Sequence, residues 1–69
     1  MSRQQRQLDE LERLCRSGAV GRAIDLAFEH FADFGRDRGV VVLLEEALAH
    51  AEVPVDVRLR FADLSAAPR

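Results

Sequence analysis

The sequence predicts a small all-α protein, an antiparallel bundle of three to four helices. Apolar residues recur at spacings of three and four through most of the chain, the pattern of helices with one buried face. Gly18 and Gly35 interrupt this pattern at points where helices would end in short turns. With 69 residues there is room for one domain, which we assign to residues 1–64, followed by a frayed tail at residues 65–69.

The first helix is expected at about residues 3–16. Its apolar face consists of Leu8, Leu11, Leu14 and Cys15. Two acid-before-base pairs at i,i+4 should support its exposed side, Asp9 with Arg13 and Glu12 with Arg16. Gly18 follows, and its freedom to adopt a positive φ predicts the turn that ends this helix.

The second and third helices are expected at about residues 20–34 and 40–51. The apolar stripe of the second consists of Val20, Ala23, Ile24, Ala27, Phe28 and Phe31. The small side chain of Ala23 predicts a close approach between helices there. The buried face of the third consists of Val40, Leu43, Leu44, Ala47, Leu48 and Ala51. We therefore expect a core that includes Leu11, Leu14, Ile24, Phe28, Phe31, Leu44 and Leu48.

Residues 53–61 allow two interpretations. Apolar residues alternate with other residues at Val53, Val55, Val57, Leu59 and Phe61, which is the period of a β-strand. Such a strand would need a partner, most naturally the same strand of a second copy in a dimer. Pro54 suits the first turn of a helix, and Val57, Phe61 and Leu64 follow at helical spacing. The helix is the favoured interpretation.

Residues 14–31, LCRSGAVGRAIDLAFEHF, resemble a single helical hairpin of the tetratricopeptide and pentatricopeptide repeat families. The resemblance is carried by Leu14, Cys15, Arg16, Ser17, Gly18, Val20, Ala23, Ile24 and Leu26. Such repeats bind proteins or, in the pentatricopeptide case, single-stranded RNA, so the resemblance implies an interaction scaffold. A second copy shifted by 34 or 35 residues would place the turn glycine at Glu52 or Val53, so the pattern is not repeated.

The side chains present argue against an enzyme. Cys15 could pair with His30 or His50, but its place on an apolar face predicts a buried structural thiol. Glu46 and His50 at i,i+4 offer two metal ligands where a zinc site needs three or four. No glycine-rich phosphate loop follows a strand. We therefore predict no catalytic residue, no metal site and no cofactor.

Charge and hydropathy indicate whether the chain binds nucleic acids or membranes. All ten basic residues are arginines, a composition typical of a GC-rich bacterial genome, and the net charge is −2. The first helix carries Arg3, Arg6, Arg13 and Arg16, but acidic residues are interspersed among them. No apolar run approaches the ~20 residues of a membrane span, and the N-terminus lacks the apolar core of a signal peptide. We expect a cytoplasmic protein that does not bind membranes.

The predicted function follows from an excess of apolar residues. Hydrophobic residues make up 48% of the chain, more than a small core can hide. We predict a protein–protein interaction module, an adaptor or regulator, that forms a homodimer. The expected contact residues are Leu26, Phe34, Val55, Val57, Leu59 and Phe61. The alternative is a nucleic-acid-binding regulator that uses the arginines of the first helix, for which salt-dependent retention by DNA or RNA would be diagnostic.

Overall fold

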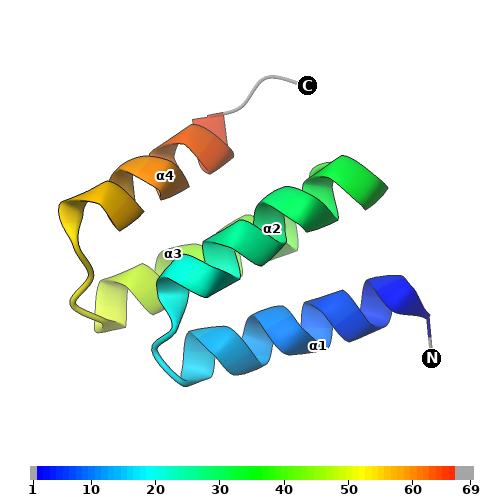
Figure 1. Cartoon of the computed structure of the whole chain (residues 1–69), viewed down its shortest axis with the longest axis horizontal. Coiled ribbons are helices and arrows are strands. Elements are labelled where there is room, and N and C mark those ends of the chain that lie inside the picture. Colours follow the sequence, from blue (N-terminus) through cyan, green and yellow to red (C-terminus); the bar gives the residue numbers. More distant parts are fainter. Residues whose placement is uncertain (1, 67–69) are drawn as a thin grey trace.

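The computed structural model describes residues 2–66 as a bundle of four helices. The helices are α1 (Arg3–Arg16), α2 (Val20–Phe34), α3 (Arg38–His50) and α4 (Val55–Ala66), and they alternate in direction along the chain (Figure 1). The predicted all-α fold is confirmed. No strand occurs within the described residues, so the strand interpretation of residues 53–61 is wrong. The alternating pattern arises because α4 carries apolar residues on two opposite faces.

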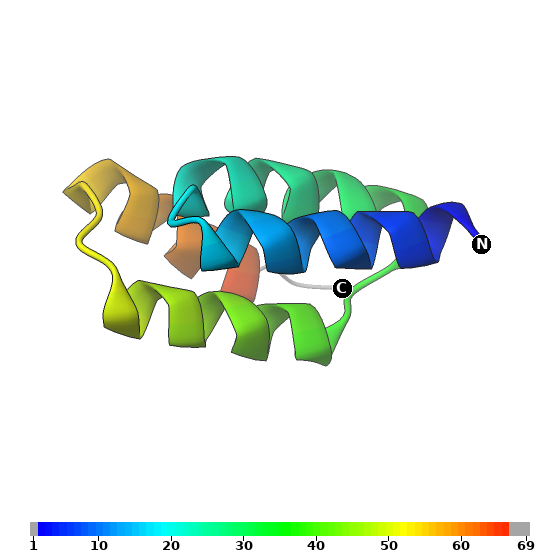
Figure 2. The same cartoon turned by 90° about the horizontal axis from the view of Figure 1, so that it is seen from below.

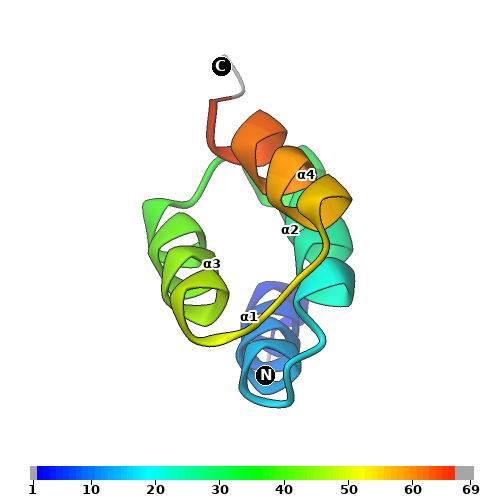
Figure 3. The ribbon, with the colours of Figure 1, turned by 90° about the vertical axis from the view of Figure 1, so that its left-hand side faces the viewer.

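Helices α2 and α3 lie between the other two helices. Each of them packs against all three remaining helices, whereas α1 and α4 lie at opposite edges of the bundle (Figure 3). α1 and α3 lie side by side and run in the same direction (Figure 2). The bundle is flattened, with extents of 32 × 28 × 15 Å. The face of α4 that points away from α1 therefore lies at an edge of the molecule.

The turn between α1 and α2 has the geometry that the sequence predicts. Gly18 adopts φ +86°, a conformation that residues with a side chain rarely take. Its N–H donates to the carbonyl of Cys15 at 3.2 Å, and the N–H of Ala19 donates to the carbonyl of Leu14 at 2.9 Å. These two bonds form a Schellman motif, which satisfies carbonyls that would otherwise lack a partner at the helix end.

Helix α3 begins two residues before the predicted start and ends one residue before the predicted end. α3 begins at Arg38 because the Asp37 side chain caps it, with Oδ1 accepting a hydrogen bond from the Gly39 N–H at 2.9 Å. α4 follows Pro54, whose carbonyl accepts hydrogen bonds from the N–H groups of Val57 and Arg58. It continues to Ala66, so two residues assigned to the tail are helical, and the rest of the tail lies outside the described residues.

The core lies between all four helices. Its fully or almost fully buried apolar residues are Leu11, Val20, Ala23, Ile24, Ala27, Val40, Leu44, Leu48 and Leu64. The predicted burial of Leu11, Ile24, Leu44 and Leu48 is confirmed. Leu14 and Phe31 are only half-buried and pack against the edge of this cluster.

The predicted burial of Phe28 is wrong, since its side chain is 37% exposed. The buried face of α2 is centred on Ala23 and Ala27 and continues to His30, which turns Phe28 toward the edge that faces α4. There the Arg60 guanidinium lies over its ring, 5.8 Å from the ring centroid. The small side chains of the two alanines allow the neighbouring helices to approach α2 closely.

We predict that Ala23→Leu destabilises the protein by about 1–3 kcal/mol, because the three added carbon atoms have no space in a site that is fully buried. Ala32→Leu is the matched control, since Ala32 lies on the exposed side of the same helix. Urea denaturation followed by circular dichroism measures both. Equal unfolding midpoints for the two variants would contradict close packing at Ala23.

Candidate protein-interaction surface

Helix α4 carries apolar side chains on two faces, and only one of them is used within the bundle. Val57, Phe61 and Leu64 form the inner face and pack against the core. The opposite face, which we call the outer stripe, consists of Val55, Leu59, Ala62 and Ala66, all of which are exposed. Val55 is 72% exposed and Leu59 is 62% exposed, the two largest values among the exposed large apolar side chains. The outer stripe is therefore an apolar surface with no partner among the described residues.

Charged residues border the outer stripe on both sides. Helical spacing places Asp56 and Asp63 along one edge and Arg58 along the other. Within residues 2–66 none of these three side chains forms an ion pair. Arg58 donates one long hydrogen bond, 3.4 Å from Nη2 to the Leu48 carbonyl oxygen. Arg60, by contrast, points toward α2 and forms an ion pair with Asp25.

The six predicted contact residues do not form one surface. Val55 and Leu59 are adjacent on the outer stripe, one turn apart. Val57 and Phe61 lie on the inner face of the same helix, where Val57 also approaches Gly21 of α2.

The other two predicted residues lie on α2. Leu26 is half-buried and lines a groove between α1 and α2. Phe34 is 38% exposed at the end of α2, where the Arg3 guanidinium lies 5.2 Å from its ring centroid. Because Arg3 belongs to α1, Phe34 lies on the side of the bundle away from the outer stripe.

His30 is a polar residue in the core whose burial the sequence did not lead us to expect. Its side chain has no exposed surface, and Nδ1 lies 2.9 Å from Oε1 of Gln7. An amide oxygen only accepts hydrogen bonds, so Nδ1 is the donor. The other ring nitrogen, Nε2, lies 3.8 Å from Oδ2 of Asp37 and has no hydrogen-bond partner among the described residues. His30 thus connects α2 to α1 and to the residue that caps α3.

The spacing of His30 was the signal that could have revealed its burial. It follows Val20, Ala23 and Ala27 at intervals of three, four and three, which places it on the buried face of α2. Its ring also lies against Phe34, with centroids 5.2 Å apart. A histidine on this face can be buried because Gln7 satisfies one of its two ring nitrogens.

The residues considered for chemistry lie in two places, one beside Cys15 and the other in the core at His30. Within residues 2–66 no group of three or more His, Cys, Asp or Glu side chains is placed to hold a metal ion. Cys15 is half-buried in a shallow groove that His50 and Glu46 also line. Burial raises the pKa of the Cys15 thiol, which keeps it protonated and a poor nucleophile at neutral pH.

Most arginines of α1 are engaged by carboxylates. Arg3 pairs with Asp33 of α2 at 3.3 Å, and Arg16 pairs with Glu12 at 3.1 Å as predicted. Arg13 pairs with Glu10 instead of the predicted Asp9, whose carboxylate accepts a hydrogen bond from the Gln5 amide. The hydrogen bond from Arg13 lowers the pKa of the Glu10 carboxyl.

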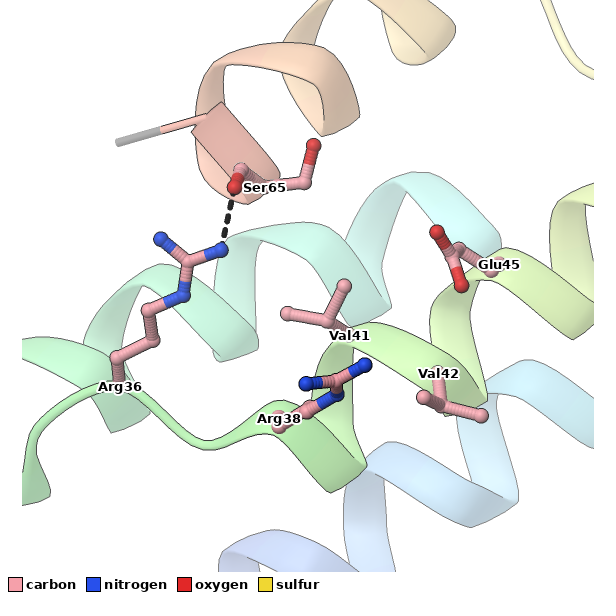
Figure 4. Close-up of a pocket in the computed structure, with 6 residues that line it drawn as sticks. All are labelled: Arg36, Arg38, Val41, Val42, Glu45 and Ser65. Atoms are coloured by element: carbon pink, nitrogen blue, oxygen red, sulfur yellow. Dashed lines mark hydrogen bonds between the residues drawn. The ribbon is translucent and has the colours of Figure 1, made fainter. Parts of the chain in front are cut away.

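Figure 4 shows a pocket of about 590 Å³ between the start of α3 and the end of α4. Its lining residues are Arg36, Arg38, Val41, Val42, Glu45 and Ser65. Arg36 donates a hydrogen bond from Nη2 to the Ser65 carbonyl oxygen, which ties the end of α4 to the loop before α3. The lining combines guanidinium groups with the Glu45 carboxylate, so it lacks the uniform charge that would select an anion.

No helix in the described part of the chain is both long and apolar enough to cross a lipid bilayer. Comparison of the chain with protein-family models, with curated proteins and with solved structures finds no match.

We predict that His30→Ala lowers the free energy of unfolding by roughly 2–4 kcal/mol, because it leaves a cavity and removes the hydrogen bond to Gln7. His50→Ala is the matched control. His50 is exposed, so its replacement should change stability by no more than about 0.5 kcal/mol. Thermal and urea denaturation measure both variants, and similar stability losses would mean that His30 does not anchor the core.

Proposed function

We propose that this chain is a small, non-enzymatic protein–protein interaction module that self-associates and acts in the cytoplasm as an adaptor or regulator. One observation carries the proposal. The core of the bundle is filled by side chains that include Ile24, Leu44 and Leu64, which are fully or almost fully buried. Val55 and Leu59 nevertheless remain largely exposed beside each other on α4. Adjacent exposed apolar side chains on a small protein are typical of a contact surface.

The contact surface that we propose is narrower than the six residues that the sequence suggested. It comprises the outer stripe, Val55, Leu59, Ala62 and Ala66. Val57 and Phe61 are used inside the bundle, and Leu26 and Phe34 lie on other faces. The resemblance of residues 14–31 to a tetratricopeptide-type hairpin is compatible with a binding role, since such hairpins serve as interaction scaffolds.

The alternative, a nucleic-acid-binding regulator, has less support. It depends on the arginines of α1, and three of those four, Arg3, Arg13 and Arg16, already pair with carboxylates. Paired guanidinium groups contribute less to the positive potential that attracts phosphates.

We predict that sedimentation equilibrium at micromolar concentration gives a mass that rises from 7.7 kDa toward about twice that value as concentration increases. Leu59→Asp should return the mass to 7.7 kDa, because a carboxylate on the outer stripe would be desolvated in the contact.

Val42→Asp is the matched control for this experiment, because Val42 is 44% exposed but belongs to α3. It should dimerise as the unmodified chain does, and circular dichroism should show both variants folded. A mass of 7.7 kDa for the unmodified chain at every concentration would overturn self-association. If Val42→Asp dissociates the dimer as much as Leu59→Asp does, the assignment of the contact surface to α4 is wrong.

A further inference from the structure

We infer that the partner of the outer stripe is the outer stripe of a second copy, lying parallel and in register, with Arg58 of each chain facing Asp63 of the partner subunit. The inference rests on the proposed function, because it requires the outer stripe to be the contact surface. It adds the identity of the partner helix, the direction in which it runs and the charge pair that selects this direction.

The spacing of the outer stripe is that of a coiled-coil seam. Val55, Leu59, Ala62 and Ala66 follow one another at intervals of four, three and four residues, which corresponds to positions d, a, d and a of a heptad. Helices with such a seam pack in pairs when the seam faces its counterpart. Val55 and Leu59 would supply most of the buried apolar area, and the two alanines would let the helix axes approach at the other end.

The charges on the two edges of the seam distinguish between the possible directions. In the same heptad, Asp56 and Asp63 occupy e positions and Arg58 occupies a g position. In a parallel pair, a g residue faces the e residue that lies five positions further along the partner. Arg58 would therefore face Asp63 of the partner subunit, and twofold symmetry makes this attractive pair twice.

The antiparallel direction is disfavoured by the same residues. In an antiparallel pair, e positions face e positions and g positions face g positions. With Val55 opposite Ala66 of the partner subunit, Asp56 would face Asp63 of the partner subunit, and twofold symmetry would make this repulsive pair twice. Arg58 would face Ser65 of the partner subunit, which carries no charge. The antiparallel arrangement therefore contains two repulsive pairs and no attractive one, so the charge pattern favours the parallel arrangement.

The charged groups are available for these contacts. Neither Arg58 nor Asp63 forms an ion pair within residues 2–66, and the single hydrogen bond of Arg58 is long at 3.4 Å. The arginine that could have competed, Arg60, is held by Asp25 on the inner side of α4. Helix α4 lies at an edge of the bundle, opposite α1 (Figure 3).

Disulfide trapping tests the direction of pairing. Cys15→Ala removes the native thiol, and Val55→Cys or Ala66→Cys is added to this background. In the parallel arrangement each variant forms a disulfide with a second copy of itself under mild oxidation. When the two variants are mixed in equal amounts, mass spectrometry detects no disulfide between one variant and the other. An antiparallel pair would yield chiefly the mixed disulfide and would overturn the inference. Ala32→Cys in the same background measures cross-linking by random collision, because Ala32 is exposed on α2.

Charge exchange tests the ion pair. Arg58→Asp should raise the dissociation constant of the dimer about tenfold, because two exposed attractive pairs become repulsive. Adding Asp63→Arg to the same chain should restore the original affinity, since the exchanged charges again attract. A double variant as weak as the single one would overturn the inference. If the chain forms a dimer that depends on Leu59 but fails the disulfide and charge-exchange tests, the proposed function stands and only the parallel arrangement is overturned. If the chain is monomeric, the proposed function and the parallel arrangement are both overturned.

Discussion

Close packing around one face of α2 is the constraint on which the rest of the structure depends. Ala23 and Ala27 present almost no side chain on this face, so that neighbouring helices can approach the α2 backbone. His30 extends the face toward Gln7 of α1 and Asp37 before α3. A chain of this size buries only about 60% of the surface that its unfolded form exposes and has little stability to spare, so each of these contacts matters.

This packing determines what is left for α4. Leu64 enters the core, and Val57 and Phe61 pack against its edge, so one face of α4 completes the bundle. The helix is anchored at its sides as well, by the Arg60–Asp25 ion pair and by the hydrogen bond from Arg36 to Ser65. A second apolar face on the same helix then has no place inside the molecule. The proposed interaction surface is thus a consequence of a core that is already filled.

Much of this fold could be predicted from local sequence patterns. The hairpin of α1 and α2 follows from helical periodicity and from Gly18, whose positive φ is a local backbone requirement. The start of α3 was placed two residues late because the capping bond from Asp37 to Gly39 was not recognised. The period-two pattern of residues 53–61 was ambiguous, because apolar residues on both sides of a helix can imitate a strand.

The features that sequence patterns missed depend on contacts between distant residues. Residue type predicts a buried phenylalanine and an exposed histidine, yet Phe28 lies at the edge and His30 in the core. The burial of His30 depends on Gln7, which lies 23 positions away and accepts a hydrogen bond from the His30 ring. The candidate surface was found only in part for the same reason. Val55 and Leu59 were among the predicted contact residues, but only the packing of α4 separates them from Val57 and Phe61.

We propose that the contact surface lies on α4, and a dilution series followed by two-dimensional ¹⁵N–¹H NMR can locate it residue by residue. We predict concentration-dependent shifts of the amide signals of Val55, Leu59, Ala62 and Ala66, while signals on the exposed side of α1 stay constant. Shifts that concentrate on α1, or a spectrum that does not change with concentration, would contradict it.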